Sequence, residues 1–428
     1  MPYPLISGAK IRAYYVLRHL AQKHEVTLLA FVRDDDRPED IAHLEGFLER
    51  VHTVPMRRSL LRDVRAVLVS LATGRPAIVA REQVEAMRRQ VEELLATGRF
   101  DAVHADQIPM AQYGLLGHAP RGLPQSRRGT GIRRLLDQHN ATFQIVERLA
   151  SCEPRLWKRA MLRREADAFA RYEADVCGRF DYVTFVTNED QQALLARMSV
   201  LHPAFSAGGD TSRNTRTSVI PICVDTQAVQ PVSPVPAPNR LTMLGTMYWP
   251  PNVEGFDWFW QNVWPRVRAL VPDARLTCIG KRPPERLLAL NQEPNVEIMG
   301  YVPDLAPYLA ETAVLVVPLR AAGGMRVKIV DAWCWGVPVV STAVGAEGIA
   351  LRQGENILLA DTPEELAEAV VRVLTDEAVR HGLRAAGRGW VEEHYDWRRV
   401  YTAWDTVYEY LLGGAAGRRS EASSVERR

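Results

Sequence analysis

The sequence predicts an α/β protein built from two Rossmann-like, doubly wound parallel-sheet domains. It has 428 residues, more than one hydrophobic core usually serves, and short β-branched runs alternate with long helical patterns on both sides of a proline-rich segment. We expect an N-terminal domain over residues 1–225, a hinge over 226–239 and a C-terminal domain over 240–395. Residues 396–412 are predicted to form a helix that packs back on the N-terminal domain. The polar tail, residues 413–428, is expected to be disordered.

The composition is that of an ordinary globular protein. Apolar residues make up 47% and charged residues 24%, and the net charge of +2 gives no general attraction to nucleic acid. The five cysteines are dispersed without a CxxC pair, which favours reduced cytosolic thiols over a disulfide framework or a zinc site. No window reaches the roughly 20 apolar residues of a membrane span, and signal-peptide features are missing. We expect a cytoplasmic protein, with peripheral contact with the inner membrane surface left open.

Strand-like runs separated by helical patterns predict the N-terminal sheet. The expected strands are residues 25–31, 101–104, 135–138, 182–186 and 219–225. The expected helices are residues 11–23, 76–97 and 142–177, and residues 202–217 are interpreted as a flexible insertion. A glycine-containing ligand loop normally follows a strand, but the loop around Gly8 starts almost at residue 1. We therefore expect the first strand of this sheet to be missing, either because the sheet lacks it or, as we favour, because the true start of the chain lies upstream.

The segment richest in chemistry, residues 314–349, lies in the C-terminal half. The expected strands of that half are residues 240–245, 274–279, 296–299, 313–318, 337–341 and 357–360. After the strand that starts residues 314–349, Gly323 and Gly324 free the backbone for a turn, and a helix is predicted from near Met325. A helix N-terminus attracts anions, and Arg326 and Lys328 add positive charge where a diphosphate would bind. The alternative is a plain surface ion pair between Lys328 and a carboxylate one turn away.

Further segments occur in a recognisable order along residues 3–412. They read PLISGAKIRAYYVLRHLAQKHEVTLLAF, FDAVH, LLDQHN, IPICVD, GYVPDL and ENILLADTPEELAEAV with HYDW. With residues 314–349, they make the chain resemble the GT-B retaining glycosyltransferases of the bacterial group 1 / family 4 type, which build cell-surface glycans and exopolysaccharides. The resemblance implies two Rossmann-like domains facing a central cleft. It also implies transfer of a sugar, with retention, from a nucleotide-diphosphate sugar to a glycan or lipid-linked acceptor, without a metal or other cofactor.

The resemblance also implies roles for individual residues. The catalytic candidates are His139, which would contact the transferred sugar, and Arg326 and Lys328, which would clamp the donor diphosphate. The donor-binding candidates are Gly323, Gly324, Asp331, Gly345 and Glu347. The candidates for an acceptor or phosphate loop are Gly8, Lys10 and Arg12. The first of two glutamates usual in the family falls on Gly323, which has no side chain, and the second falls on Asp331, which keeps a carboxylate.

The residues leave several alternatives open. The missing glutamate would also suit a non-catalytic nucleotide-sugar-binding scaffold protein, and a GT-B nucleotide-sugar epimerase is a further alternative, although acid–base carboxylates are sparse. The only DxD-like run, residues 34–36, is more typical of a solvated loop than of a metal site. Basic residues at 57–65, 121–134 and 155–164 favour an anionic membrane surface. A solvated helical face explains these basic residues equally well.

Overall fold

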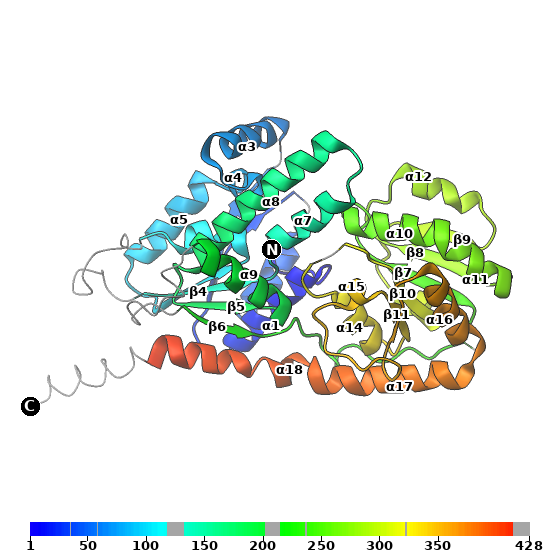
Figure 1. Cartoon of the computed structure of the whole chain (residues 1–428). Helices are drawn as coiled ribbons and strands as arrows, with labels where there is room; N and C mark the ends of the chain where they lie inside the picture. The colour runs from blue at the N-terminus through cyan, green and yellow to red at the C-terminus, as the bar shows by residue number, and fades with distance from the viewer. Residues whose placement is uncertain are drawn as a thin grey trace, which may run out of the picture. The chain divides into compact units, whose positions relative to one another are not determined.

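The computed structural model describes residues 1–34, 36–57, 59–117, 132–201, 215–235, 238–321 and 323–413 (Figure 1). The chain forms two compact units. The C-terminal unit is Ile222–Val400, and the N-terminal unit is Met1–Pro221 together with the residues from Tyr401 on. Both units combine helices with parallel sheets, so the predicted α/β class is confirmed.

The N-terminal unit has two sheets whose strands all run parallel. One pairs β1 (Thr27–Val32) with β2 (Arg50–Pro55). The other has the order β3 (Ala102–Asp106), β4 (Arg133–Gln138), β5 (Tyr182–Phe185), β6 (Arg216–Val219). The sequence does not predict β2, because Arg50, His52 and Thr53 interrupt its apolar residues. The strand predicted at 219–225 ends where it was expected to begin, since Pro221 has no N–H to donate to a neighbouring strand.

Helices connect these strands. They are α1 (Gly8–Leu20), α2 (Pro38–Glu45), α3 (Leu60–Thr73), α4 (Ala77–Arg81), α5 (Glu85–Ala96), α6 (Ala111–Gly114), α7 (Thr142–Cys152), α8 (Leu156–Cys177) and α9 (Asn188–Leu201). The long helical pattern over 142–177 is divided between α7 and α8 because Pro154 cannot continue a helix. Residues 403–413 are also helical and contact α1, where Asp405 lies 3.0 Å from the ring of His19. Most of the predicted insertion (202–214) and of the tail (414–428) lies outside the described residues.

The C-terminal unit contains a six-stranded parallel sheet of order β12-β11-β10-β7-β8-β9. Its strands are β7 (Arg240–Leu244), β8 (Arg275–Ile279), β9 (Val296–Met299), β10 (Thr312–Val317), β11 (Val339–Ser341) and β12 (Leu358–Leu359). Each lies where a hydrophobic run predicts it. Counted from β7, the order from the far edge is 3-2-1-4-5-6, which is the doubly wound Rossmann arrangement.

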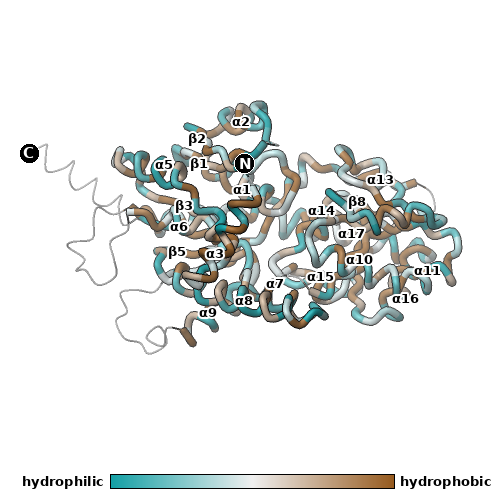
Figure 2. Tube along the Cα trace, turned by 90° about the horizontal axis from the view of Figure 1, so that it is seen from above, coloured by the Kyte–Doolittle hydropathy of each residue, from teal (hydrophilic) through white to brown (hydrophobic). Residues whose placement is uncertain are grey.

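Helices also link the strands of the C-terminal unit, and hydrophobic residues alternate with hydrophilic ones along them (Figure 2). They are α10 (Pro250–Asn262), α11 (Trp264–Leu270), α12 (Glu285–Leu288), α13 (Ala306–Ala310), α14 (Val327–Cys334), α15 (Ala343–Ala346), α16 (Pro363–Thr375), α17 (Glu377–His394) and α18 (Trp397–Val400). Every residue of β10 is buried, as expected for a central strand covered on both faces. The apolar faces of α10, α11 and α16 complete the core with Phe256, Phe259, Trp264 and Leu366.

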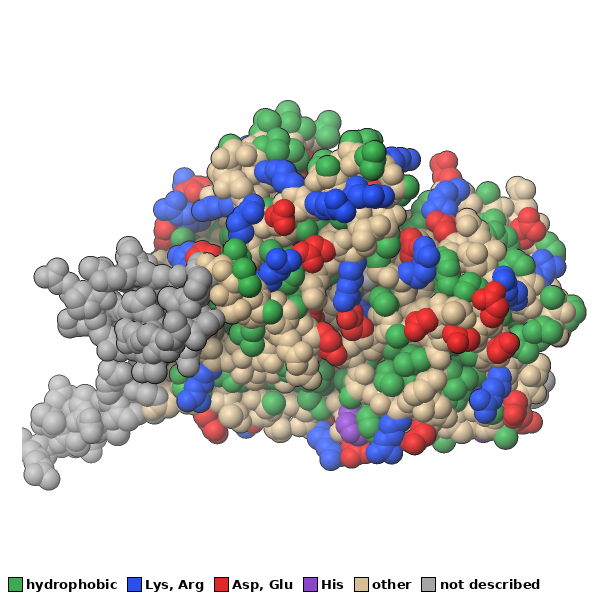
Figure 3. All heavy atoms as spheres, viewed as in Figure 1, with side chains coloured by type: hydrophobic (Ala, Val, Ile, Leu, Met, Phe, Trp, Pro, Cys, Tyr) green, Lys and Arg blue, Asp and Glu red, His purple; other side chains and the backbone are tan. Residues whose placement is uncertain are grey.

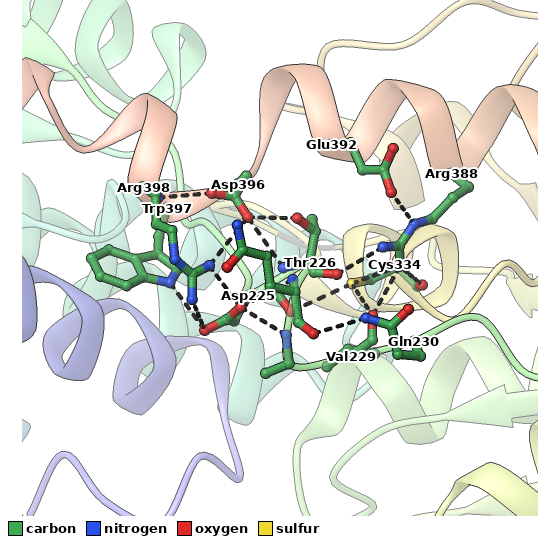
Figure 4. A network of polar contacts seen from close by, with 12 residues as sticks. Asp225, Thr226, Val229, Gln230, Cys334, Arg388, Glu392, Asp396, Trp397 and Arg398 are labelled. Carbon is green, nitrogen blue, oxygen red and sulfur yellow. Dashed lines mark hydrogen bonds and ion pairs between the residues drawn. The ribbon is translucent and has the colours of Figure 1, made fainter.

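The start of the predicted hinge is fixed within the C-terminal unit (Figure 4). Both oxygens of Asp225 accept hydrogen bonds from the guanidinium of Arg398, at 2.8 and 2.9 Å. Thr226 donates its hydroxyl to Asp396, and Arg388 of α17 donates to the carbonyl oxygens of Thr226 and Val229. Residues 225–229 are therefore attached to α17 and to the segment that follows it.

Candidate functional site

The C-terminal sheet has a topological switch point between β7 and β10, the two neighbours from which the strand order runs in opposite directions. In open α/β sheets, ligands bind beyond the carboxyl ends of the strands at this place. The chain after β7 passes Gly245 and enters α10, and the chain after β10 enters α14. Lys328, in the first turn of α14, donates from Nζ to Oδ1 of Asn252 in α10, at 3.0 Å. A lysine predicted from the sequence therefore lies at the switch point.

Glycines bring the backbone close together at this edge of the sheet. A Cβ atom on Gly245 would lie 2.9 Å from Nζ of Lys328, and a Cβ atom on Gly280, after β8, would lie 1.6 Å from the carbonyl oxygen of Gly245. No side chain fits at Gly280, because real Cβ atoms do not approach backbone that closely. Gly245, Asn252 and Gly280 are not among the site residues predicted from the sequence. A glycine directly after each of two neighbouring strands is the signal that could have identified the two glycines.

Arg326 joins two of the predicted donor-binding loops. Its side chain is 6% exposed and donates to the carbonyl oxygens of Gly323, at 2.8 Å, and Glu347, at 3.0 Å. Gly324 between them has φ +68°, in the left-handed region that glycine adopts without strain. Gly345 packs against the ends of β10 and β11, since a Cβ there would lie 2.6 Å from the carbonyl oxygen of Val317. Arg326 is the N-cap of α14, which begins two residues later than predicted.

Burial shifts the acid–base equilibria of two residues on α14. It lowers the pKa of Lys328 to about 8, and the positive charge of Arg326 lowers this pKa as well. Burial also raises the pKa of Asp331 to about 7. The ammonium of Lys328 is therefore held in a poorly solvated place, where an anionic ligand would stabilise its charged form.

The N-terminal unit has a second polar cluster around His139, which follows β4. Its side chain is 4% exposed, and Nε2 lies 2.8 Å from Oδ1 of Asp106 and 3.4 Å from Oδ2 of Asp137. Burial by itself would lower the pKa of His139, but the two carboxylates outweigh burial and raise the pKa to about 9. His139 is thus held as an imidazolium at neutral pH.

The predicted N-terminal loop divides into two parts. Gly8 is the first residue of α1, and the N–H of Lys10 donates to the hydroxyl of Ser7, the N-cap of that helix. The ammonium of Lys10 lies 3.7 Å from Asp36. Arg12 differs from the expectation of a phosphate or acceptor contact, because its side chain is fully buried and binds Asp137 through both carboxylate oxygens. The structure therefore groups Arg12 with His139 rather than with Gly8 and Lys10.

Two groups of acidic residues are candidates for a metal site, the cluster around His139 and the DxD-like run at residues 34–36, and neither suits a metal ion well. Ligand atoms of Asp106, Asp137 and His139 lie within 4.8 Å of one another. Both oxygens of Asp137, however, are already hydrogen-bonded to Arg12, whose positive charge opposes a second cation. In the DxD-like run, Asp36 accepts the N–H of Arg33 at 3.0 Å, which is the behaviour of a turn residue. Residue 35 lies outside the described residues.

Comparison with known proteins agrees with this geometry. Residues 238–376, which contain the switch point and α14, match the family model Glycosyl transferases group 1. The chain contains a group 1 glycosyltransferase domain. The resemblance to group 1 glycosyltransferases predicted from the sequence is thereby confirmed.

Relatives of the group 1 domain and of the whole chain are distant. An uncharacterised 44.6 kDa protein in the cps region of Klebsiella pneumoniae is 20% identical over 420 residues, covering 94% of this chain and 96% of that protein. A GDP-mannose-dependent monoacylated α-(1-6)-phosphatidylinositol monomannoside mannosyltransferase of Corynebacterium glutamicum is 28% identical over 145 residues, covering 31% of this chain and 38% of that protein.

Solved structures similar to this chain confirm the predicted GT-B fold. Sucrose-phosphate synthase from Thermosynechococcus elongatus has a TM-score of 0.65 and 17% identity, covering 96% of this chain and 97% of that one. Anabaena HepE in complex with UDP and glucose has a TM-score of 0.59 and 12% identity, covering 94% and 96%. Within the described ranges of the chain, no helix has the length and apolar character needed to cross a bilayer.

Proposed function

We propose that the protein is a metal-independent hexosyltransferase that moves a sugar, with retention, from a nucleotide-diphosphate sugar to a glycan or lipid-linked acceptor. The observation that carries this proposal is the contact between Lys328 and Asn252 at the switch point of the C-terminal sheet. It places a poorly solvated ammonium next to the N-terminus of α14, in a domain that matches the group 1 glycosyltransferases. Both features attract a diphosphate.

The proposed chemistry depends on charge that develops on the leaving group. As the bond between the anomeric carbon and the diphosphate oxygen breaks, negative charge grows on the diphosphate, and the acceptor hydroxyl bonds to the same face of the sugar while its proton passes to a phosphate oxygen. Lys328 would bind this charge more strongly in the transition state than in the ground state. Arg326 would hold the loops of Gly323 and Glu347 around the donor and add a second positive charge. We propose that these cations act in place of a metal, and that His139 contacts the transferred sugar.

Two experiments test the proposal. A thermal-shift panel of UDP, GDP and ADP sugars identifies the donor class, because a ligand that binds only the folded state raises its melting temperature. HepE with UDP and glucose and the GDP-mannose-dependent relative make UDP and GDP hexoses the first to try. The stabilising sugar is then assayed for turnover with EDTA, using Lys328→Ala as the inactive comparison.

The outcomes separate the alternatives. Transfer or slow hydrolysis that survives EDTA and is lost in Lys328→Ala supports the transferase. Binding without turnover would instead indicate a scaffold protein, and epimerised nucleotide sugar would indicate an epimerase. Donor binding that is unchanged in a Lys328→Ala, Arg326→Ala double variant contradicts the proposal.

An exposed apolar face in the N-terminal unit supports a lipid-linked acceptor. On α3, six large apolar side chains with helical spacing are at least half exposed: Leu60, Leu61, Val64, Val67, Leu68 and Leu71. They form much of the hydrophobic surface at the top of Figure 3. Arg164 of α8 donates to the carbonyl oxygen of Ser70 of α3, so the two helices are joined. Further large apolar side chains are exposed on α8, namely Leu156, Trp157 and Met161. Arginines at 159, 163 and 171 of α8 flank this region.

We propose that this face binds an anionic membrane surface peripherally, which would place the protein at the inner face of the membrane. Co-sedimentation with vesicles containing anionic phospholipid tests this. A Leu61→Glu, Leu68→Glu variant is expected to lose binding. Leu270→Glu, a similarly exposed leucine of the C-terminal unit, serves as the control. Equal sedimentation of wild type and the double variant would contradict the membrane proposal and leave the donor proposal untouched.

A further inference from the structure

We propose that Arg12 and Asp106 are positioning residues for His139, which they fix at the carboxyl edge of the four-stranded sheet. The proposal rests on the proposed function in one respect, namely that His139 contacts the transferred sugar. Neither residue needs to touch substrate. Arg12 acts through Asp137, whereas Asp106 acts on the ring directly.

Arg12 of α1 connects three parts of the N-terminal unit. Its Nε and Nη2 atoms donate to the two carboxylate oxygens of Asp137, each at 2.7 Å. Its Nη1 atom donates to the carbonyl oxygens of Ile220, at 2.6 Å, and Pro221, at 3.1 Å. Pro221 is the last residue before the chain passes to the C-terminal unit. The planar guanidinium satisfies four acceptors at once, which a lysine at this position could not do.

Asp137 transmits this restraint to His139. Its Oδ1 atom accepts a further hydrogen bond from the hydroxyl of Thr184, at 2.7 Å, and its Oδ2 atom lies 3.4 Å from Nε2 of His139. The carboxylate is 1% exposed, and Arg12 lowers its pKa despite burial. Because Arg12 and Thr184 fix the position of the buried Asp137 carboxylate, this carboxylate orients Nε2 of the imidazole in one direction.

Asp106 supplies the closer carboxylate, at 2.8 Å, and its side chain is 38% exposed. The charged or titratable groups that face the imidazole are Arg12 of α1, His104 and Asp106 of β3, and Asp137 of β4. Burial lowers the pKa of His104, which also lies 3.0 Å from the hydroxyl of Tyr408, so His104 is neutral while His139 is charged.

The backbone after His139 is anchored separately. The N–H of Ala141 donates to Asp190 at 2.8 Å, and the N–H of Thr142 donates to Glu173 at 2.9 Å. Substitutions at Arg12 and Asp106 therefore test the orientation and charge of the ring rather than the course of the loop. Nδ1 and Nε2 of His139 are both buried and make no hydrogen bond of good geometry among the described residues, but Nε2 alone lies within ion-pair distance of Asp106 and Asp137.

The first experiment reads His139 in the ligand-free, full-length protein. Imidazole nitrogen signals are titrated by NMR with ¹⁵N-labelled histidine, and His139→Gln identifies the signal. Wild type is expected to titrate near pH 9, and Asp106→Asn is expected to lower this pKa by about one unit or more. Glu49→Gln, at an exposed carboxylate elsewhere in the unit, should change nothing. A wild-type pKa near 6.5, or no shift in Asp106→Asn, would overturn the proposal.

The second experiment uses kinetics to separate positioning from folding. Arg12→Lys keeps the charge but not the four-acceptor geometry, and it is expected to lower kcat at least tenfold with a smaller change in KM. In a His139→Gln background, the same substitution should have little further effect. The role of Arg12 would be overturned if the double variant lost kcat by the product of the two single losses, which would mean that the residues act independently. An unchanged kcat in Arg12→Lys would overturn it as well. If Asp106→Asn shifts the pKa while His139→Gln stays fully active, the positioning holds and the proposed sugar contact of His139 fails.

Discussion

Nζ of Lys328 and Oδ1 of Asn252 lie 3.0 Å apart, which joins the helices that follow the two central strands of the C-terminal sheet. The partner is a neutral amide, and no carboxylate of the described residues is among the groups whose charge acts on Lys328. The ammonium is thus oriented without being neutralised. This arrangement leaves its charge available to an incoming anion.

The pH dependence of donor binding should follow the protonation of Lys328. Its pKa lies near 8, below the ordinary 10.5, so the ammonium is charged below pH 8 and loses its proton above it. Donor affinity should therefore be constant below about pH 7 and fall by up to tenfold per pH unit above about pH 8. Calorimetric titration with a nucleotide sugar between pH 6.5 and 9 measures this. Lys328→Arg, which stays charged, should show a flat profile; a flat wild-type profile would contradict the assignment.

Replacing Asn252 with aspartate should weaken donor binding while stabilising the free protein. The new carboxylate would pair with Lys328 and compete with the diphosphate for the same charge. We expect at least a tenfold loss of donor affinity together with a higher melting temperature without ligand. Asn262→Asp, at the other end of α10, is the matched control. Unchanged affinity in Asn252→Asp would show that the diphosphate does not use Lys328.

Gly280→Ala should disrupt the carboxyl edge of the C-terminal sheet. The added methyl would lie 1.6 Å from the carbonyl oxygen of Gly245, so one of the two loops must move. Strain of this kind typically costs about 1–3 kcal/mol, and more where backbone is the obstacle. Gly300→Ala is the control, because a Cβ atom there meets nothing within 4 Å. Denaturant melts of both variants check the difference, and equal stability would contradict the close approach.

Asp331→Asn should stabilise the ligand-free protein at alkaline pH. The pKa of Asp331 is raised from 3.8 to about 7 by burial, so the folded state binds more protons than the unfolded state between these values. Stability is therefore lost as pH rises from about 4 to about 7 and stays reduced above that. Asparagine removes this cost, for an expected gain of about 1–2 kcal/mol at pH 8 that vanishes at pH 4. A difference that is independent of pH would contradict this explanation.

The sequence predicts the regular parts of the fold because their signals are local. All six strands of the C-terminal sheet follow hydrophobic runs, and the glycines before α14 mark its loop. It does not predict β2, in which Arg50, His52 and Thr53 interrupt the apolar residues, although β2 pairs with the preceding strand β1. Nor does it predict the partners of the site: Lys328 and Asn252 are 76 residues apart, and Arg12 and Asp137 are 125 apart. Such pairs follow from the strand order, which no local pattern encodes.

The attachment of Asp225 to Arg398 has a practical consequence for dissecting the protein. The chain enters the C-terminal unit after Pro221 and leaves it after Val400, and this ion pair joins the first and last parts of that stretch. A gene fragment that encodes residues 222–400 therefore retains the ion pair between its two ends and is the natural piece to express alone. The other half has no such fragment: a simple C-terminal truncation would remove Trp404, Asp405 and Tyr408 from contact with α1 and β3.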